Sequence, residues 1–171
     1  MTPGNTIRMR RPTLLCAIGV SVWSVTIAGR QAPASGALSA PLRAHLQDGR
    51  FDVVTSIRGL PLGVRERLQT MFGGTLDLAE PGAEFQKTDV IVTQRLPSRR
   101  LIAAGCSTDF YCLVYYERGG IASTWRVALF HWAPDATRLE WGGTAPGGLA
   151  TIDDVRKAVL SGAIKPQTGS W

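Results

Sequence analysis

The sequence predicts one α+β domain, an antiparallel β-meander of four to five strands with N-terminal helices and a C-terminal helix packed on one face. Three observations favour this class. Apolar residues recur at helical spacing up to residue 72, runs of β-branched and aromatic residues fill residues 88–141, and a further helical pattern follows residue 150. Connections as short as those between the β-rich runs leave no room for the crossovers of a parallel sheet.

Two helical patterns come first in the chain. A short helix is predicted for residues 39–46, with Ser39 as its N-cap and a proline in its first turn. The stronger pattern covers residues 61–72, where one stripe is apolar and the opposite side is charged or polar. Gly73 and Gly74 supply the stop signal, because glycine adopts the left-handed capping conformation without a side-chain clash.

The β-rich part is divided by turn residues into short runs. Ser107-Thr108-Asp109, Arg118-Gly119-Gly120 and Pro134-Asp135 mark the turns. The strands predicted in this part are residues 90–93, 101–106, 111–117, 121–132 and 138–141. Two brief strands, residues 51–54 and 76–79, are predicted before it. Thr151 then caps a last helix, and Asp153 and Asp154 lie in its first turn, where the helix dipole favours negative charge.

The N-terminus is predicted to be a removable signal peptide. A basic region ending at Arg11 precedes an apolar or small-residue run, residues 14–28, of about 15 residues. Cleavage after Ala28 or after Ala34 fits the small-residue rule, and Met9 is an alternative start. The alternative, a retained membrane anchor, is disfavoured because a span needs about 20 apolar residues.

These features divide the chain into four predicted segments and place it in the periplasm or outside the cell. The segments are a signal peptide at 1–28 (cleavage extending to 34), a flexible lead-in at 29–40, a single α+β domain at 41–164 and a loose tail at 165–171. No membrane span is expected once the signal is removed.

The basic charge of the chain belongs largely to its first residues. The full sequence has 19 basic and 13 acidic residues, and cleavage after Ala34 removes four arginines and no acid, which leaves 15 against 13. No basic cluster longer than Arg99-Arg100 remains. Nucleic-acid binding needs a clustered basic surface, so this class of partner is excluded.

Cysteine usage predicts one disulfide. Cys16 lies in the signal peptide, which leaves Cys106 and Cys112 as an even pair in an oxidising compartment. Their spacing is not that of a Cys-x-x-Cys redox motif. A metal site would need further ligands, and His45 and His131 are the only histidines, so no metal or cofactor is predicted.

Strand alternation predicts which side of the sheet is free to bind. If Cys106 faces Cys112 and the next turn is Gly119-Gly120, one face is apolar and meets the helices. The opposite face mixes small, aromatic and charged residues, a composition typical of recognition surfaces. The predicted binding residues on that face are Tyr115, Glu117, Thr124 and Arg126. The alternative is that the N-terminal segment covers the aromatic residues of this face.

No catalytic or cofactor motif is present, so two classes of function stay open. The first is a non-enzymatic binding, inhibitor or accessory protein, whose partner is an envelope protein or a small polar ligand and whose oligomeric state is open. The alternative is a hydrolase-like enzyme with a site near His131, oriented by Asp109 or Asp135, with Ser107 or Ser123 as nucleophile. The glycine-rich stretch 142–148 is interpreted as a connection rather than an anion site.

Overall fold

The computed structural model describes residues 1, 36–89, 96–167 and 171. The chain divides into two units, Met1–Arg30 and Gln31–Trp171, and all described helices and strands belong to the second. The predicted signal peptide and the predicted strand at 90–93 lie outside the described residues. Among the residues described, no helix is long and apolar enough to cross a bilayer.

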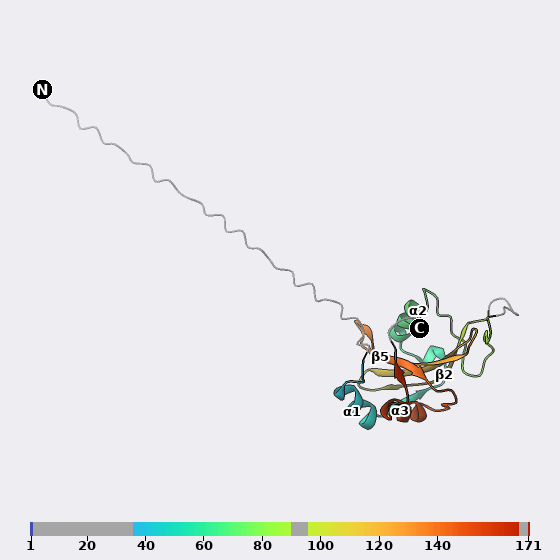
Figure 1. The fold of residues 1–171 in the computed structure, drawn as a ribbon. Helices are drawn as coiled ribbons and strands as arrows, with labels where there is room; N and C mark the ends of the chain where they lie inside the picture. The colour runs from blue at the N-terminus through green and yellow to red at the C-terminus, as the bar shows by residue number, and fades with distance from the viewer. Residues whose placement is uncertain (2–35, 90–95, 168–170) are drawn as a thin grey trace. The chain divides into compact units, whose positions relative to one another are not determined.

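The sheet is an antiparallel meander in which every strand pairs with its neighbour in the sequence (Figure 1). Its strands are β1 (Phe51–Val54), β2 (Arg99–Ser107), β3 (Tyr111–Arg118), β4 (Thr124–Trp132), β5 (Thr137–Ala145) and β6 (Lys165–Pro166). The α+β class and the meander are confirmed. The sheet has six strands, one more than the upper limit predicted.

The sixth strand comes from the segment predicted to be a loose tail. Lys165 and Pro166 pair with Thr144 and Gly143, and proline is tolerated there because an edge strand needs no further donor. β5 also runs on to Ala145, beyond the predicted end at residue 141. A Cβ at Gly143 would lie 2.4 Å from the carbonyl oxygen of Lys165, so the absence of a side chain lets β6 approach.

The helices cover both faces of the sheet rather than one. α1 (Ala40–Asp48) and α3 (Ile152–Leu160) lie together on one side, and α2 (Leu62–Met71), preceded by the short helix η1 (Ile57–Gly59), lies on the other (Figure 1). The prediction that all helices share a face is therefore wrong for α2. The physical reason is that both faces of the central strands are apolar and must be covered.

Each face has its own hydrophobic core. The first core, under α1 and α3, is built on Leu42, Leu46, Phe51, Leu113, Tyr115, Val127, Leu129, Trp141, Ala145, Ile152, Val155, Ala158, Val159 and Ile164. The second core, under α2, is built on Leu60, Val64, Leu68, Leu78, Leu101, Ala104, Cys112, Val114, Tyr116, Ala128, Phe130 and Leu139. The central strands β3 and β4 contribute to both.

The register between β3 and β4 differs from the predicted one. Arg118 pairs with Thr124, so residues 119–123 form a longer connection than the two-residue turn expected at Gly119-Gly120. In the observed pairing, Tyr115 lies opposite Val127. The predicted register of β4 against β3 is shifted from the observed one by an odd number of residues. An odd shift moves every side chain of one strand to the other face.

Candidate functional site

The four predicted binding residues do not share a face. Tyr115 and Glu117 project toward the first core, and Thr124 and Arg126 lie on the side of the second core. Three of the four are buried, Thr124 being the partly exposed one. The prediction of an open face is therefore wrong. The predicted register between β3 and β4 is off by an odd number of residues, so it assigned side chains from opposite faces of the sheet to the same face.

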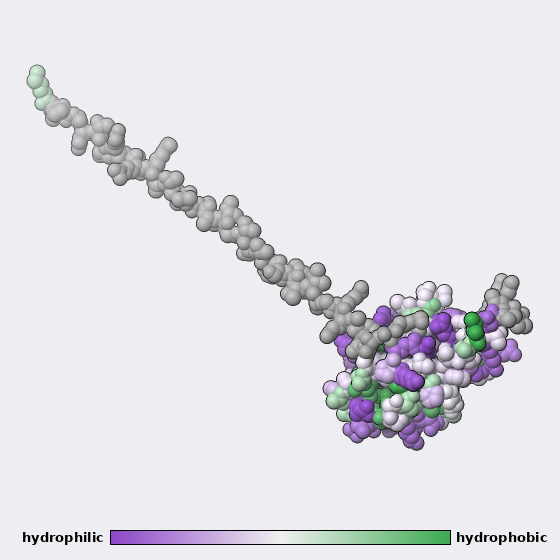
Figure 2. Space-filling view, viewed as in Figure 1, coloured by the Kyte–Doolittle hydropathy of each residue, from purple (hydrophilic) through white to green (hydrophobic). Residues whose placement is uncertain are grey.

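The partners of these residues explain their burial. The Tyr115 hydroxyl donates to the carbonyl oxygen of Pro146 at 2.9 Å, and Glu117 forms an ion pair with Arg100 at 2.9 Å. Figure 2 shows hydrophobic residues in small groups on the side of the domain that it presents, rather than as one extensive area. These residues therefore do not form an exposed recognition surface, and a ligand needs a space that the two covering layers leave open.

Such a space lies beside the disulfide, at the end of the sheet where β2 joins β3 and β4 joins β5. We call this cavity of about 740 Å³ the disulfide cleft. Its walls are the N-terminus of α2, the two turns and the start of β1, represented by Pro61, Leu62, Glu66, Cys106, Trp132 and Asp135. The volume lies within the range of about 300 to 1,000 Å³ typical of ligand sites.

The disulfide positions one wall of this cleft. Cys106 and Cys112 are bonded directly across β2 and β3, which confirms the predicted pairing. Cys106 is partly exposed and lines the cleft, while Cys112 is fully buried in the second core. The bond therefore ties the turn that carries Ser107 and Thr108 to a fixed point of the core.

Apolar and aromatic side chains are displayed at the cleft. Leu62, at the start of α2, is 61% exposed and lines it. The indole nitrogen of Trp132 is buried and has no hydrogen-bond partner among the described residues. Burying a donor without an acceptor costs free energy, so this N–H is an unused donor on a residue that lines the cleft.

Phe110 extends the aromatic surface next to Trp132. Its ring is 44% exposed and lies edge-on to the indole, with 5.2 Å between the ring centroids. Its backbone has φ of 64°, an unfavourable conformation for a bulky side chain, and it is held there because Phe110 O accepts a 2.7 Å hydrogen bond from Trp132 N. Strain of this kind concentrates at functional positions.

The cleft carries an excess of negative charge. Asp52, Glu66 and Asp135 line it together with the basic residue Arg67, and Asp52 is paired with Arg50 at 3.2 Å. Neither Glu66 nor Asp135 has an ion-pair partner in the part of the chain that the structure describes. These carboxylates would attract a cationic group brought near the apolar wall.

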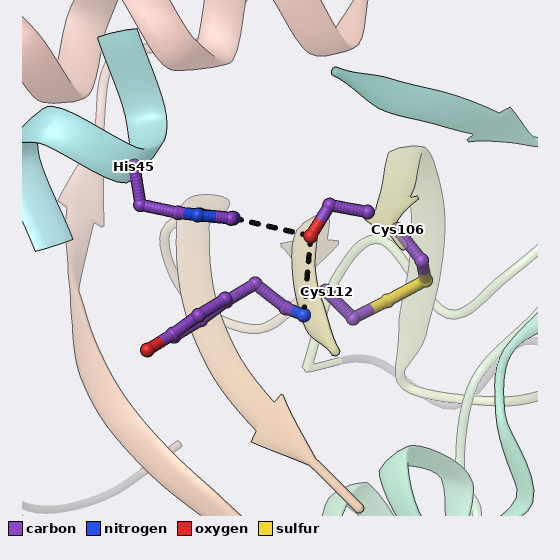
Figure 3. Close-up of a disulfide and its surroundings, with 5 residues drawn as sticks. His45, Cys106 and Cys112 are labelled. Carbon is purple, nitrogen blue, oxygen red and sulfur yellow. Dashed lines mark hydrogen bonds between the residues drawn. A yellow bond between two sulfur atoms is a disulfide. The ribbon is translucent and has the colours of Figure 1, made fainter. Parts of the chain in front are cut away.

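The contacts of His45 bear on the hydrolase alternative (Figure 3). Ser107 and Asp109 meet His45 of α1 rather than His131. His45 Nε2 lies 3.1 Å from Ser107 Oγ, and His45 Nδ1 lies 3.9 Å from Asp109 Oδ2. The ring of His131 instead lies edge-on to Tyr111, at 5.0 Å between the ring centroids.

This serine and histidine link α1 to the hairpin. Ser107 is only 4% exposed, and its Oγ also accepts a 3.2 Å hydrogen bond from Tyr111 N. Ser107 is among the residues that line the disulfide cleft, but its pairing with Phe51 places its side chain on the side of the first core. Its Oγ is engaged there with His45 and Tyr111, and these contacts support a structural role.

Within residues 36–89 and 96–167, no group of three or more His, Cys, Asp or Glu side chains is placed to hold a metal ion. Comparisons with protein-family models, curated proteins and solved structures found no match to the chain. Function is therefore inferred from the geometry of the cleft.

Proposed function

We propose that this chain is an exported binding domain, periplasmic or secreted, that holds an extended segment of a partner protein in the disulfide cleft. The observation that carries the proposal is the buried Trp132 N–H without a partner, on the wall of a cavity of about 740 Å³ and next to exposed Leu62. A non-enzymatic binding, inhibitor or accessory role needs such a site and no reacting groups.

Two features support export. The intramolecular disulfide is of a kind that persists in oxidising compartments such as the periplasm and the extracellular space. The N-terminal sequence has the basic and apolar regions of a signal peptide.

The chemistry of the cleft defines the occupant. An apolar side chain of the segment packs on Leu62 and the Trp132 ring, while a main-chain carbonyl accepts the indole N–H. A Lys or Arg beside it lies close to Glu66 and Asp135, which adds orientation and a faster association rate. The expected ligand is thus a segment in which an apolar residue is flanked by a basic one.

Selection from a displayed library of random peptides against the purified, oxidised protein tests this proposal. Peptides that combine apolar and basic residues are expected to be enriched. Leu62→Asp introduces a charge into the apolar wall and is expected to weaken the selected peptides at least tenfold, about 1.4 kcal/mol.

Ile121→Asp is the matched control. Ile121 is 93% exposed and does not line the cleft, so this substitution is expected to leave both folding and peptide affinity unchanged. The proposal is wrong if no peptide is enriched, or if the enriched peptides bind the Leu62→Asp protein as tightly as the original one.

A further inference from the structure

A cluster of arginines lies on the α2 side of the sheet at the end opposite the disulfide cleft. Arg99 of β2 pairs directly with Arg118 of β3, and Tyr116 pairs with Arg126 of β4. Tyr116 and Arg118 are two residues apart on one strand, so all four side chains share a face. Like charges placed directly opposite one another destabilise a sheet unless something compensates them.

Arg99 is compensated within the protein. Its guanidinium forms a 2.9 Å ion pair with Asp77 and donates to the main-chain oxygen of Trp171 at 2.9 Å. It also lies over the Phe72 ring, 4.2 Å from its centroid. These contacts account for its charge and most of its donors.

Among the residues that the structure describes, Arg126 is buried without an anionic partner. It is 9% exposed, and its one hydrogen bond runs from Nη1 to the neutral Thr144 hydroxyl at 2.6 Å. The same hydroxyl accepts this bond and donates its own proton to Gln167 Oε1. The Arg126 Nε is buried and has no partner in the described part of the chain, and burial lowers the pKa of this guanidinium. Buried arginines are otherwise nearly always paired.

Two further donors beside Arg126 are unused. Arg118 is partly exposed and has no hydrogen-bond or ion-pair partner among the residues that the structure describes. The Tyr116 hydroxyl is fully buried, also without a partner. Burial raises the pKa of Tyr116 to about 12, so the hydroxyl keeps its proton and remains a donor.

We propose that Arg118, Arg126 and the Tyr116 hydroxyl form a binding site for a phosphate-type oxyanion, either free or carried on a larger molecule. Two uncompensated positive charges match a dianion, and guanidinium groups bind tetrahedral oxyanions through paired N–H donors. The site is independent of the disulfide cleft, so either assignment can fail while the other holds.

Thermal unfolding in sodium phosphate and in sodium chloride at equal ionic strength and pH 7.5 tests the site. Phosphate is expected to raise the melting temperature by about 3 °C or more relative to chloride. Arg118→Met is expected to abolish this difference, and Tyr116→Phe to reduce it. Arg138→Met, which alters an exposed arginine paired with Glu140, is the control that keeps it. A parallel titration with phenyl phosphate, if tighter, assigns the anion to a larger molecule.

Arg126→Met separates a ligand site from a structural arginine. It is expected to raise the melting temperature in chloride, since it removes a buried charge without an anionic partner, and to abolish the response to phosphate. The proposal is overturned if phosphate stabilises no more than chloride does. It is also overturned if Arg126→Met lowers the melting temperature and leaves the phosphate response intact.

Discussion

Tyr115 and Tyr116 are neighbours on β3 whose hydroxyls differ in their hydrogen bonding. Both rings are fully buried, Tyr115 in the first core and Tyr116 in the second. The Tyr115 hydroxyl donates to Pro146 O at 2.9 Å, whereas the Tyr116 hydroxyl has no partner within the described residues. The pair therefore offers an internal comparison of what a single buried hydrogen bond contributes.

Replacing each of the two tyrosines by Phe measures this difference. Tyr115→Phe removes a satisfied hydrogen bond and is expected to lower the free energy of unfolding by about 1 kcal/mol. Tyr116→Phe removes an unsatisfied hydroxyl and is expected to leave stability unchanged or higher. Urea denaturation of both variants checks this. A larger loss for Tyr116→Phe than for Tyr115→Phe would contradict the described contacts.

His45 makes stability depend on pH. Burial lowers the pKa of His45, the nearby charge of Asp109 opposes the shift, and Arg156 adds to it. The unfolded chain therefore takes up a proton near pH 6.5 while the folded one does not, so stability is full above that value. It falls as the pH drops from there through the lower folded-state pKa.

Denaturation midpoints between pH 8 and pH 5 are the measurement for His45. His45→Gln is expected to flatten this part of the profile, with His131→Gln as the matched variant that keeps it. An unchanged pH profile in His45→Gln would show that another group causes the decline.

At the scale of elements, the two helices on the first core begin differently. Thr151 accepts a 3.1 Å hydrogen bond from Asp154 N, and the Asp154 carboxylate accepts one from Thr151 N, which completes a capping box on α3. Ser39 occupies the same position before α1, yet its side chain makes no capping hydrogen bond. Both residues are predicted as N-caps from the sequence, and only Thr151 makes the capping bond.

Alanine substitution at the two caps tests this distinction. Thr151→Ala is expected to lower the free energy of unfolding by about 1 kcal/mol, the usual contribution of a capping side chain. Ser39→Ala is the matched control and is expected to change it little. Equal losses in the two variants, measured by urea denaturation, would mean that α1 has a cap the structure does not show.

The disulfide is the second feature at this scale. It closes a short loop between β2 and β3, so the chain-entropy estimate of its contribution is roughly 2 kcal/mol. The double variant Cys106→Ser/Cys112→Ser is expected to remain folded with a lower melting temperature. Thiol titration of the native protein before and after reduction is the accompanying measurement. A double variant that is unfolded, or as stable as the original, would contradict this estimate.

At the scale of the whole molecule, the layers explain where a ligand can bind. α1 and α3 cover the first core, and Arg156 of α3 joins them by donating to the carbonyl oxygens of Leu46 and Gly49 at 2.7 and 2.9 Å. α2 covers the second core together with its flanking segments, which contribute Leu60 and Leu78. The disulfide cleft lies on this side of the sheet, where the start of α2 meets the turns.

Local patterns were sufficient to predict the class, the helices and the disulfide. Helical spacing, cap residues and turn residues act within a few positions, and Cys106 and Cys112 flank one turn. The faces of β3 and β4 were not predictable in this way, because one loop length, that of residues 119–123, decides them. The bulge between Leu101 and Ala103 has the same effect on the start of β2.

The sequence also contains a weaker indication of where the disulfide cleft lies. In an antiparallel meander, the turn after β2 and the turn after β4 lie at the same end of the sheet. Phe110 and Trp132 are aromatic residues beside those two turns, so their proximity was predictable from the topology. The contribution of α2 to the same site was not, because nothing in the sequence says which face that helix covers.

The most direct measurement of the central claim follows the Trp132 indole N–H by ¹H–¹⁵N NMR as a selected peptide is added, with the resonance assigned through Trp132→Phe. A buried donor without a partner that gains a carbonyl acceptor is expected to move downfield and saturate with the binding curve. A Trp132 resonance that stays in place while the peptide binds would show that the partner segment lies elsewhere and that the disulfide cleft is not the binding site.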